Sequence, residues 1–232
     1  MWLLLQLSRP LHGAHSASPE TSRTAALEAS GPCDQPAIEV QPWVPRADSN
    51  AVSREVADLF HASVHAIDTG VYSVAQKAAW APTPPDYEAW AERVCVKQPT
   101  LATVRGRLAG FMELDASGYI DCAYTHPQFQ GRGVCSALLQ AIERRASEAG
   151  VDCLRVDASE AAVGFFKRRG FRLSRRNVVR RHGVSLVNYR MLKPLAARTT
   201  THDAGSGDAR CARARASGEA PQGLRARGTP AE

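Results

Sequence analysis

Between residues 38 and 195, segments with the alternating apolar and polar pattern of a strand follow segments with the apolar spacing of a helix. Residues 38–43 alternate apolar with polar side chains, which predicts a half-buried strand. Residues 49–67 follow Asp48 or Ser49 as a possible cap and place five apolar residues at helical spacing: Val52, Val56, Leu59, Phe60 and Val64. Residues 72–80 and a short segment that starts at Asp86 are further predicted helices, separated by proline-rich residues 81–85.

Three strands are predicted next, over residues 93–104, 108–114 and 119–125, and the tight turns between them imply antiparallel neighbours. The clearest helix covers residues 133–149, where the apolar stripe consists of Val134, Leu138, Leu139, Ile142 and Ala146. A strand at 151–157, a helix at 160–169 capped by Ser159, and strands at 171–174 and 185–192 complete the order. The pattern predicts an α/β fold with a mixed, mostly antiparallel central sheet of about seven strands and flanking helices.

The two ends of the chain differ in composition from this central part. Residues 1–35 are rich in Ser and Ala, and residues 196–232 are rich in Gly, Ala, Arg and Thr with almost no large apolar residue. Residues 196–232 cannot bury enough apolar surface to offset the entropy lost on ordering, so they are expected to be disordered. Residues 1–35 are expected to be a disordered N-terminal extension. One domain over residues 36–195 is expected, and no segment approaches the roughly 18 consecutive apolar residues of a membrane span.

Charge and cysteine content narrow the class of protein. The formal net charge is +6, and residues 167–193 contain ten Lys or Arg and no Asp or Glu. Such a block suits a phosphorylated cofactor, nucleic acid or an anionic membrane, or is a solvated surface. The six cysteines form no CxxC pair and no zinc spacing, so we expect a reducing, cytoplasmic location with neither a metal site nor a disulfide framework.

Residues 130–135, Gln-Gly-Arg-Gly-Val-Cys, lie between a predicted strand and the clearest predicted helix. A helix N-terminus presents unpaired N–H groups and the positive end of the helix dipole, glycines let the backbone approach an anion closely, and Arg132 adds a charged donor. The segment predicts a cradle for phosphate or pyrophosphate, with an ordinary glycine-bearing turn as the alternative. It lacks the Gly-Lys-Ser/Thr of a P-loop and the third glycine of a dinucleotide fingerprint.

Gln130, Gly133 and Cys135 occupy the spacing of a Gln/Arg-x-x-Gly-x-Gly/Ala signature, and here the chain resembles the GCN5-related N-acetyltransferase (GNAT) superfamily. The resemblance covers residues 38–195 and includes the Tyr-Thr-His-Pro step at 124–127, the helix and Gly-Phe at 162–171, and the last strand at 183–191. Residues 72–82 look like a segment of one bacterial subgroup of uncertain substrate.

The resemblance implies acetyl-CoA as the donor and a primary amine as the acceptor, without a metal. By position, the pyrophosphate would be held by the backbone N–H groups of Gln130, Gly131, Arg132, Gly133, Val134 and Cys135. The backbone of Tyr124 and Thr125 would bind the pantetheine arm, and Arg168 would reach the 3′-phosphate, with a solvated helix residue as its alternative role. Cys135 departs from the usual Gly or Ala, but it is small enough for the position.

The implied reaction needs a general base, because an acceptor amine must lose a proton to attack a thioester. Asp121, on the strand near the implied thioester position, is the first candidate and Glu113 is the second, while Tyr124 is a candidate acid. Phe166 stands where many relatives have a tyrosine that protonates the leaving thiolate, and phenylalanine cannot donate a proton.

Two other functions stay open beside the transferase. Phe166 is compatible with a CoA-binding regulatory module that has little catalysis, and the basic block is compatible with a nucleic-acid-binding protein. Nucleic acid is not the expected partner, because no interleaved aromatic residues or known nucleic-acid motif accompany the charge. The acceptor is not identified by the sequence, and assembly as a homodimer is left open.

Overall fold

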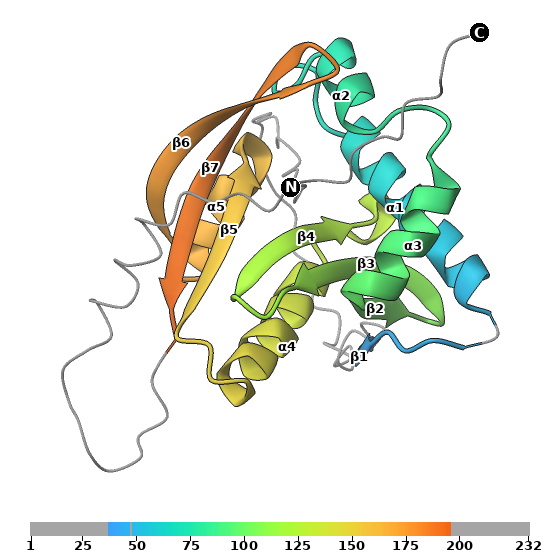
Figure 1. The fold of residues 1–232 in the computed structure, drawn as a ribbon, viewed down its shortest axis with the longest axis vertical. Helices are drawn as coiled ribbons and strands as arrows, with labels where there is room; N and C mark the ends of the chain where they lie inside the picture. The colour runs from blue at the N-terminus through green and yellow to red at the C-terminus, as the bar shows by residue number, and fades with distance from the viewer. Residues whose placement is uncertain (1–36, 47, 196–232) are drawn as a thin grey trace, which may run out of the picture.

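Seven strands form one open sheet in the computed structural model of the chain, which describes residues 37–46 and 48–195. The strands are β1 (Ile38–Pro42), β2 (Thr100–Val104), β3 (Arg107–Leu114), β4 (Tyr119–Thr125), β5 (Cys153–Ser159), β6 (Arg172–Arg181) and β7 (Val184–Pro194). Their order across the sheet is β1-β2-β3-β4-β5-β7-β6 (Figure 1). Within it, β4 and β5 are parallel and the other neighbours are antiparallel, which confirms the predicted mixed sheet.

Five α-helices and one short 3₁₀ helix accompany the sheet in the part of the chain that the structure describes. They are α1 (Ser49–His65), α2 (Val74–Trp80), α3 (Tyr87–Lys97), η1 (Pro127–Phe129), α4 (Val134–Glu148) and α5 (Glu160–Arg168). A tight turn cannot join parallel strands, and α4 makes the crossover from β4 to β5.

Each face of the sheet has its own hydrophobic core. On one face, α4 and α5 contribute Leu138, Leu139, Ile142, Phe165 and Phe166 to a cluster with the strands. On the other face, α1, α2 and α3 contribute Val56, Leu59, Phe60, Trp80 and Val94. The apolar stripe predicted for residues 133–149 is therefore the face by which α4 packs on the sheet.

Gly110 of β3 brings α4 close to the strand. A Cβ at this position would lie 2.8 Å from the Tyr124 carbonyl oxygen, 2.9 Å from Val134 Cγ1 and 3.1 Å from Leu138 Cδ1. Only a residue without a side chain lets the first turns of α4 lie this near to β3 and β4.

The helix α3 differs most from the prediction. The sequence predicts a strand over residues 93–104, but residues 93–97 belong to α3 and the strand begins at Thr100. The Asp86 side chain caps the helix by accepting a bond from the Ala89 N–H at 3.0 Å, and Trp90 and Val94 share its packed face. A short apolar segment of this length cannot be assigned to strand or helix by its period alone.

The last hairpin is longer than predicted. The expected strands at 171–174 and 185–192 extend to β6 and β7, which are joined at His182 and Gly183 with φ angles of 47° and 79°. This extension carries Arg181 to the turn end of the hairpin. The disordered segments expected at residues 1–35 and 196–232 lie outside the described residues. Among the described helices, none combines the length and apolarity needed to cross a bilayer.

Candidate active site

The loop that enters α4 has two residues in the left-handed region. Gly131 and Gly133 have φ angles of 73° and 87°, which residues with a side chain rarely adopt. No atom lies within 4 Å of a Cβ built on Gly131. Gly133 is the N-cap of α4, and no side chain caps the helix there. The N–H groups of the first turn have no intrahelical acceptor, so they are oriented toward whatever occupies the space before the helix.

A pocket of about 250 Å³ lies at this helix start. Its lining comes from three places: the end of β4, the loop and first turn of α4, and the last turn of α5. Arg168 is exposed on α5 and lines the pocket, and Arg169 donates to the Ser136 hydroxyl. Positive charge and free N–H groups therefore converge on one concave surface, which suits an anion.

The two parallel strands beside the pocket diverge toward their C-terminal ends. The β4–β5 register consists of Tyr119 with Arg155 and Ile120 with Val156. Three buried hydroxyls at the far ends of these strands make no hydrogen bond within the described residues: those of Tyr124, Thr125 and Ser159. A buried polar group without a partner is costly, so these hydroxyls fit a polar ligand lying between the strand ends.

Ser159 shows how this end of β5 differs from the prediction. It is the N-cap of α5 as expected, but its side chain makes no capping bond.

The Thr125 carbonyl, by contrast, is well bonded, because it accepts from the Ser63 hydroxyl at 3.0 Å and from the Gln130 side-chain amide at 3.4 Å. Further bonds from Thr125 to a ligand would therefore involve its other polar groups.

A network of ion pairs lies on the opposite face of the sheet, under α3. Arg93 donates through Nε to Glu113 Oε1 at 2.9 Å, through Nη2 to Glu113 Oε2, and through Nη2 to Asp121 Oδ2 at 2.8 Å. Lys97 lies one helical turn further, and its Nζ is 3.0 Å from the same Asp121 oxygen. Both carboxylates proposed as general bases are therefore paired with cations that the sequence analysis did not identify.

Asp121 sits at a β-bulge in β4. Leu114 pairs with Ile120 and Glu113 with Cys122, which leaves Asp121 as the additional residue between them. Bulges of this kind re-aim a side chain and are frequent beside active sites. The bulge aims Asp121 toward α3, where Arg93 and Lys97 reach it.

The environment shifts the pKa values of the two carboxyl groups in opposite directions. Burial alone would raise the pKa of Asp121, but Arg93 and Lys97 outweigh it and hold this pKa below its ordinary value. Burial raises the pKa of Glu113, against the opposing effect of Arg93, and Glu113 is only 1% exposed. Asp121 is consequently ionised at neutral pH.

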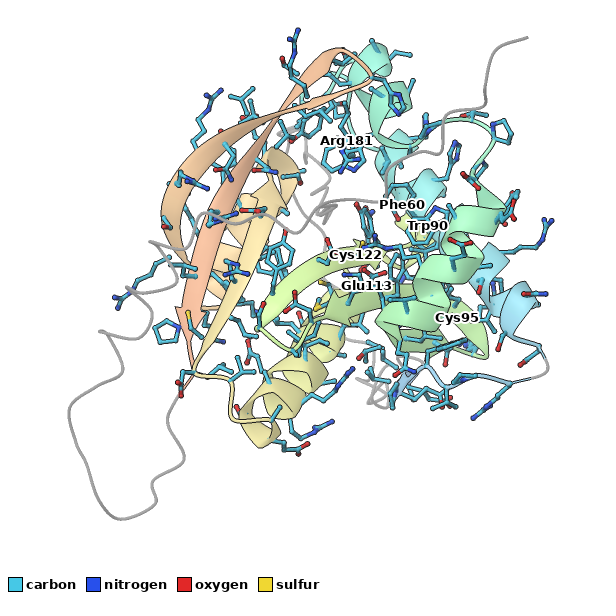
Figure 2. The ribbon with its side chains drawn as sticks, viewed as in Figure 1. Phe60, Trp90, Cys95, Glu113, Cys122 and Arg181 are labelled. Atoms are coloured by element: carbon cyan, nitrogen blue, oxygen red, sulfur yellow. The ribbon has the colours of Figure 1, made fainter. Side chains whose placement is uncertain are left out.

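The candidate acid Tyr124 lies among aromatic rings. Its ring centroid is 4.9 Å from that of Phe60 and 5.5 Å from that of Phe111. Burial raises its pKa well above the ordinary value, and Arg93 and Trp80 oppose this shift only in part. The phenol therefore stays protonated and able to donate. Figure 2 shows Phe60 and Trp90 beside Cys122 and Glu113, between the α1 and α3 helices and the strands.

Phe166 and Cys135 are both core residues. Phe166 is fully buried between Phe165 and Phe171, at ring distances of 5.2 and 4.9 Å. Cys135 is also buried, and burial raises the pKa of its thiol, so the helix start does not make it a reactive thiolate. Within residues 37–46 and 48–195, no group of three or more His, Cys, Asp or Glu residues could hold a metal ion.

Comparison with known proteins gives consistent matches. Residues 69–193 match the family model described as an acetyltransferase (GNAT) domain. The chain is 34% identical over 120 residues to YafP of Escherichia coli K12, an uncharacterised N-acetyltransferase, and this match covers 52% of the chain and 75% of YafP.

Solved structures share the fold. A GCN5-related N-acetyltransferase from Rhodopseudomonas palustris superposes with a TM-score of 0.62 at 35% identity, over 69% of this chain and 96% of that one. The PaiA N-acetyltransferase of Thermoplasma acidophilum, solved in complex with coenzyme A, has a TM-score of 0.54 at 18% identity, over 68% and 99% of the two chains. The second likeness concerns the fold alone.

Proposed function

The chain belongs to the GNAT acetyltransferase family, and we propose that it transfers an acetyl group from acetyl-CoA to a primary amine of a small molecule or protein by direct attack in a ternary complex. The observation that carries the proposal is the pocket in front of α4. There the loop around Gly131 and Gly133, the uncapped helix start and the unpaired Thr125 hydroxyl meet on one surface.

Charged and uncharged groups of this pocket would bind different parts of acetyl-CoA. The first N–H groups of α4 and the loop before it suit the pyrophosphate, because helix N-termini bind phosphate. Arg168 lines the same pocket and suits a further phosphate, the 3′-phosphate of CoA. The hydroxyls of Thr125 and Ser159, on either side of the diverging strands, suit the amides of the pantetheine arm. The PaiA structure with coenzyme A supports the choice of donor.

Acetyl-CoA supplies the acetyl group as a thioester. In the proposed step, the amine nitrogen forms a bond to the carbonyl carbon while the carbon–sulfur bond breaks. Asp121 takes the proton that the amine loses, and Tyr124 gives its hydroxyl proton to the departing thiolate. Asp121 is ionised and Tyr124 is protonated, so each starts in the protonation state that its proposed role requires.

Glu113 has a different proposed role. Both of its oxygens accept from Arg93, so its carboxylate is engaged by the guanidinium rather than turned to a substrate. It positions Arg93, which in turn bonds to Asp121. Removing one partner of such a buried pair leaves a charge without compensation.

Calorimetry and a thiol-release assay test the proposal. We expect the full chain to bind acetyl-CoA and to release free thiol from it when a panel of primary amines is added. Absence of acetyl-CoA binding would overturn the proposal. Binding without thiol release on any amine would favour the alternative of a CoA-binding module, for which the buried Phe166 is the motivating observation.

Nucleic-acid binding is a weaker alternative, because the structure neutralises part of the basic block. Arg190 Nε is 3.0 Å from Asp157 Oδ1, and Lys193 Nζ is 2.6 Å from Glu143 Oε1. A gel shift that appears at low salt and disappears as salt rises would support this alternative.

A further inference from the structure

Residues 72–82, the segment that resembles a bacterial subgroup, contain α2 and the residues that flank it. The Ser73 hydroxyl accepts from the Gln76 N–H at 3.2 Å, and the Gln76 side chain accepts from the Ser73 N–H at 2.9 Å. These two bonds form a capping box at the start of the helix. The ring of Tyr72, just before the cap, meets Trp80 edge-on at a centroid distance of 5.4 Å, and Tyr72 is 2% exposed. The segment is therefore a short helix with a fixed start and a buried tyrosine in front of it.

The Tyr72 hydroxyl joins two segments that lie far away in sequence. It donates to the Val187 carbonyl of β7 at 3.0 Å and accepts from the N–H of Glu160, the first residue of α5, at 3.2 Å. Burial raises the pKa of Tyr72 to about 12, so the hydroxyl keeps the donated proton at neutral pH. One turn further along, the Gln76 side-chain amide donates to the Ser185 carbonyl at 3.1 Å. The start of α2 is thus bound to β7 at two places and to α5 at one.

The α2 helix is also bound to the end of α1. Lys77 Nζ donates to the carbonyls of His65 at 3.2 Å and Ile67 at 2.8 Å, where α1 ends. The α1 helix is in turn bonded to β4 through Ser63 and Thr125, at 3.0 Å. Figure 1 shows α2 between α1 and the turn end of the β6–β7 hairpin. The helix therefore connects the side of the sheet that holds Thr125 with the side that holds β7 and α5.

This connection ends beside Ser159, whose buried hydroxyl makes no hydrogen bond within the described residues. Ser159 directly precedes Glu160 and pairs with Asn188 of β7 in the sheet. The register between β4 and β5 consists of residues 119–120 with residues 155–156, so it does not reach Ser159. The position of Ser159 relative to the end of β4 is therefore set by groups outside this register, and Tyr72 bonds to the N–H of the next residue.

We propose that Tyr72 is a positioning residue for acetyl-CoA: its hydroxyl holds Ser159 at the distance from the end of β4 at which the Ser159 and Thr125 hydroxyls bind the amides of the pantetheine arm. A binding group is effective only when packing and hydrogen bonds from neighbouring residues hold it in place. Tyr72 supplies both, through its packed ring and its two hydrogen bonds. This inference rests on the proposed function and adds a residue that acts on the donor through Ser159.

Two ligands with and without the arm test the proposal. Acetyl-CoA contains the acetylated pantetheine arm, whereas 3′-phospho-ADP has the same adenosine and phosphates without it. Tyr72→Phe keeps the ring against Trp80 and removes both hydrogen bonds of the hydroxyl. In calorimetry with the full chain, we expect this variant to bind acetyl-CoA about five- to tenfold more weakly, as the loss of a buried hydrogen bond provides, and to bind 3′-phospho-ADP as the wild type does.

Tyr87→Phe is the matched control. The Tyr87 hydroxyl, at the start of α3, donates to Asp58 Oδ1 at 2.8 Å at an exposed position, so this variant also loses a tyrosine hydrogen bond. It should bind both ligands as the wild type does.

Gln76→Glu is a second test variant. Its carboxylate still accepts from the Ser73 N–H but cannot donate to the Ser185 carbonyl, so one of the two bonds to β7 is lost while the cap is kept. It should show the same selective loss of acetyl-CoA binding as Tyr72→Phe, and it provides the comparison if that variant does not fold.

A double variant tests whether Tyr72 acts through Ser159. Ser159→Ala removes the hydroxyl and should itself weaken acetyl-CoA binding about fivefold. Adding Tyr72→Phe should then weaken binding little further, because the group that Tyr72 positions is already gone. Losses that multiply in the double variant would show that Tyr72 acts by another route, and the inference would be wrong.

The outcomes separate the inference from the proposed function. Equal weakening of both ligands by Tyr72→Phe, or unchanged binding of both, would overturn the inference while the acetyltransferase proposal stands. If the wild type binds no acetyl-CoA, the proposed function fails first and the inference fails with it.

Discussion

The Ser63 hydroxyl donates a hydrogen bond to the Thr125 carbonyl at 3.0 Å, joining the last turns of α1 to the end of β4 across 62 residues of sequence. Both residues are buried, at 3% and 4% exposure. This bond fixes the strand end that lines the pocket, and with Gln130 it fills the acceptor capacity of the Thr125 carbonyl.

We expect Ser63→Ala to lower the free energy of unfolding by about 1 kcal/mol and to weaken acetyl-CoA binding about fivefold, because a buried acceptor loses its better donor. Denaturant unfolding and calorimetry measure the two effects. Ser53→Ala is the matched control on the same helix, since the Ser53 hydroxyl donates to the Ser49 carbonyl, one turn earlier. It should leave acetyl-CoA binding unchanged, and equal losses of binding in both variants would contradict the role given to Ser63.

The left-handed glycine at the start of α4 gives a second prediction. Gly133→Ala should cost about 1–2 kcal/mol of stability because of its φ of 87°, and it should also weaken acetyl-CoA binding by displacing the first turn. Gly106→Ala is the control, because Gly106 has a φ of 71° in the β2–β3 turn and open space around it. It should lose similar stability but bind acetyl-CoA normally. Unchanged binding in Gly133→Ala would argue against the cradle.

Gly110→Ala tests how closely α4 packs on the sheet. The added methyl would meet backbone and core atoms within about 3 Å, so we expect a loss of about 1–3 kcal/mol in thermal or denaturant unfolding. Gly164→Ala should act in the opposite direction, by about 0.5–1 kcal/mol, because Gly164 is exposed on α5 and faces only the end of the Arg168 side chain. A tolerated Gly110→Ala would show that α4 can move away from β3.

Asp121→Asn tests the proposed proton acceptor. We expect kcat to fall by about 10²–10⁴-fold while the acetyl-CoA dissociation constant changes little, because an amide cannot take the proton. Glu92→Gln removes an exposed carboxylate from the same neighbourhood, on α3, and should keep wild-type kcat. A fully active Asp121→Asn would reassign proton transfer to water or to another group.

The same carboxylate should make stability depend on acid pH. Its folded pKa lies below the ordinary value, so its contribution is complete above about pH 4 and is lost as pH falls through the folded pKa. The unfolding free energy measured between about pH 5 and 2 should therefore fall less steeply in Asp121→Asn than in the wild type. Glu92→Gln should keep the wild-type slope, and identical slopes in all three proteins would contradict the ion-paired state of Asp121.

Patterns of local sequence predicted the parts of the fold that one period dominates. The strand at 119–125 and the amphipathic helix that became α4 have long, regular patterns and clear stops. The strand predicted over residues 93–97 was wrong because Val94 and Val96 suit either a strand or a helix over so short a segment. The full length of β6 was not predicted because its arginines obscure the alternation of apolar and polar residues, although His182 and Gly183 mark a short turn between two strands.

These two misassignments also explain which site residues were missed. With residues 93–97 placed on a strand, Arg93 and Lys97 could not be recognised as neighbours at i and i+4 on one helix face. With β6 ending early, Arg181 belonged to a general basic block rather than to the hairpin turn. Long-range partners such as Glu113 for Arg93 depend on tertiary packing, which local periodicity does not encode.

The short register between β4 and β5 has a mechanical consequence. The β4–β5 register consists of two residue pairs, at Tyr119 and Ile120, and it joins the first four strands of the sheet to the last three. A ligand that bonds to both groups of strands would restrict their relative motion, and part of its binding free energy would then offset the conformational entropy lost.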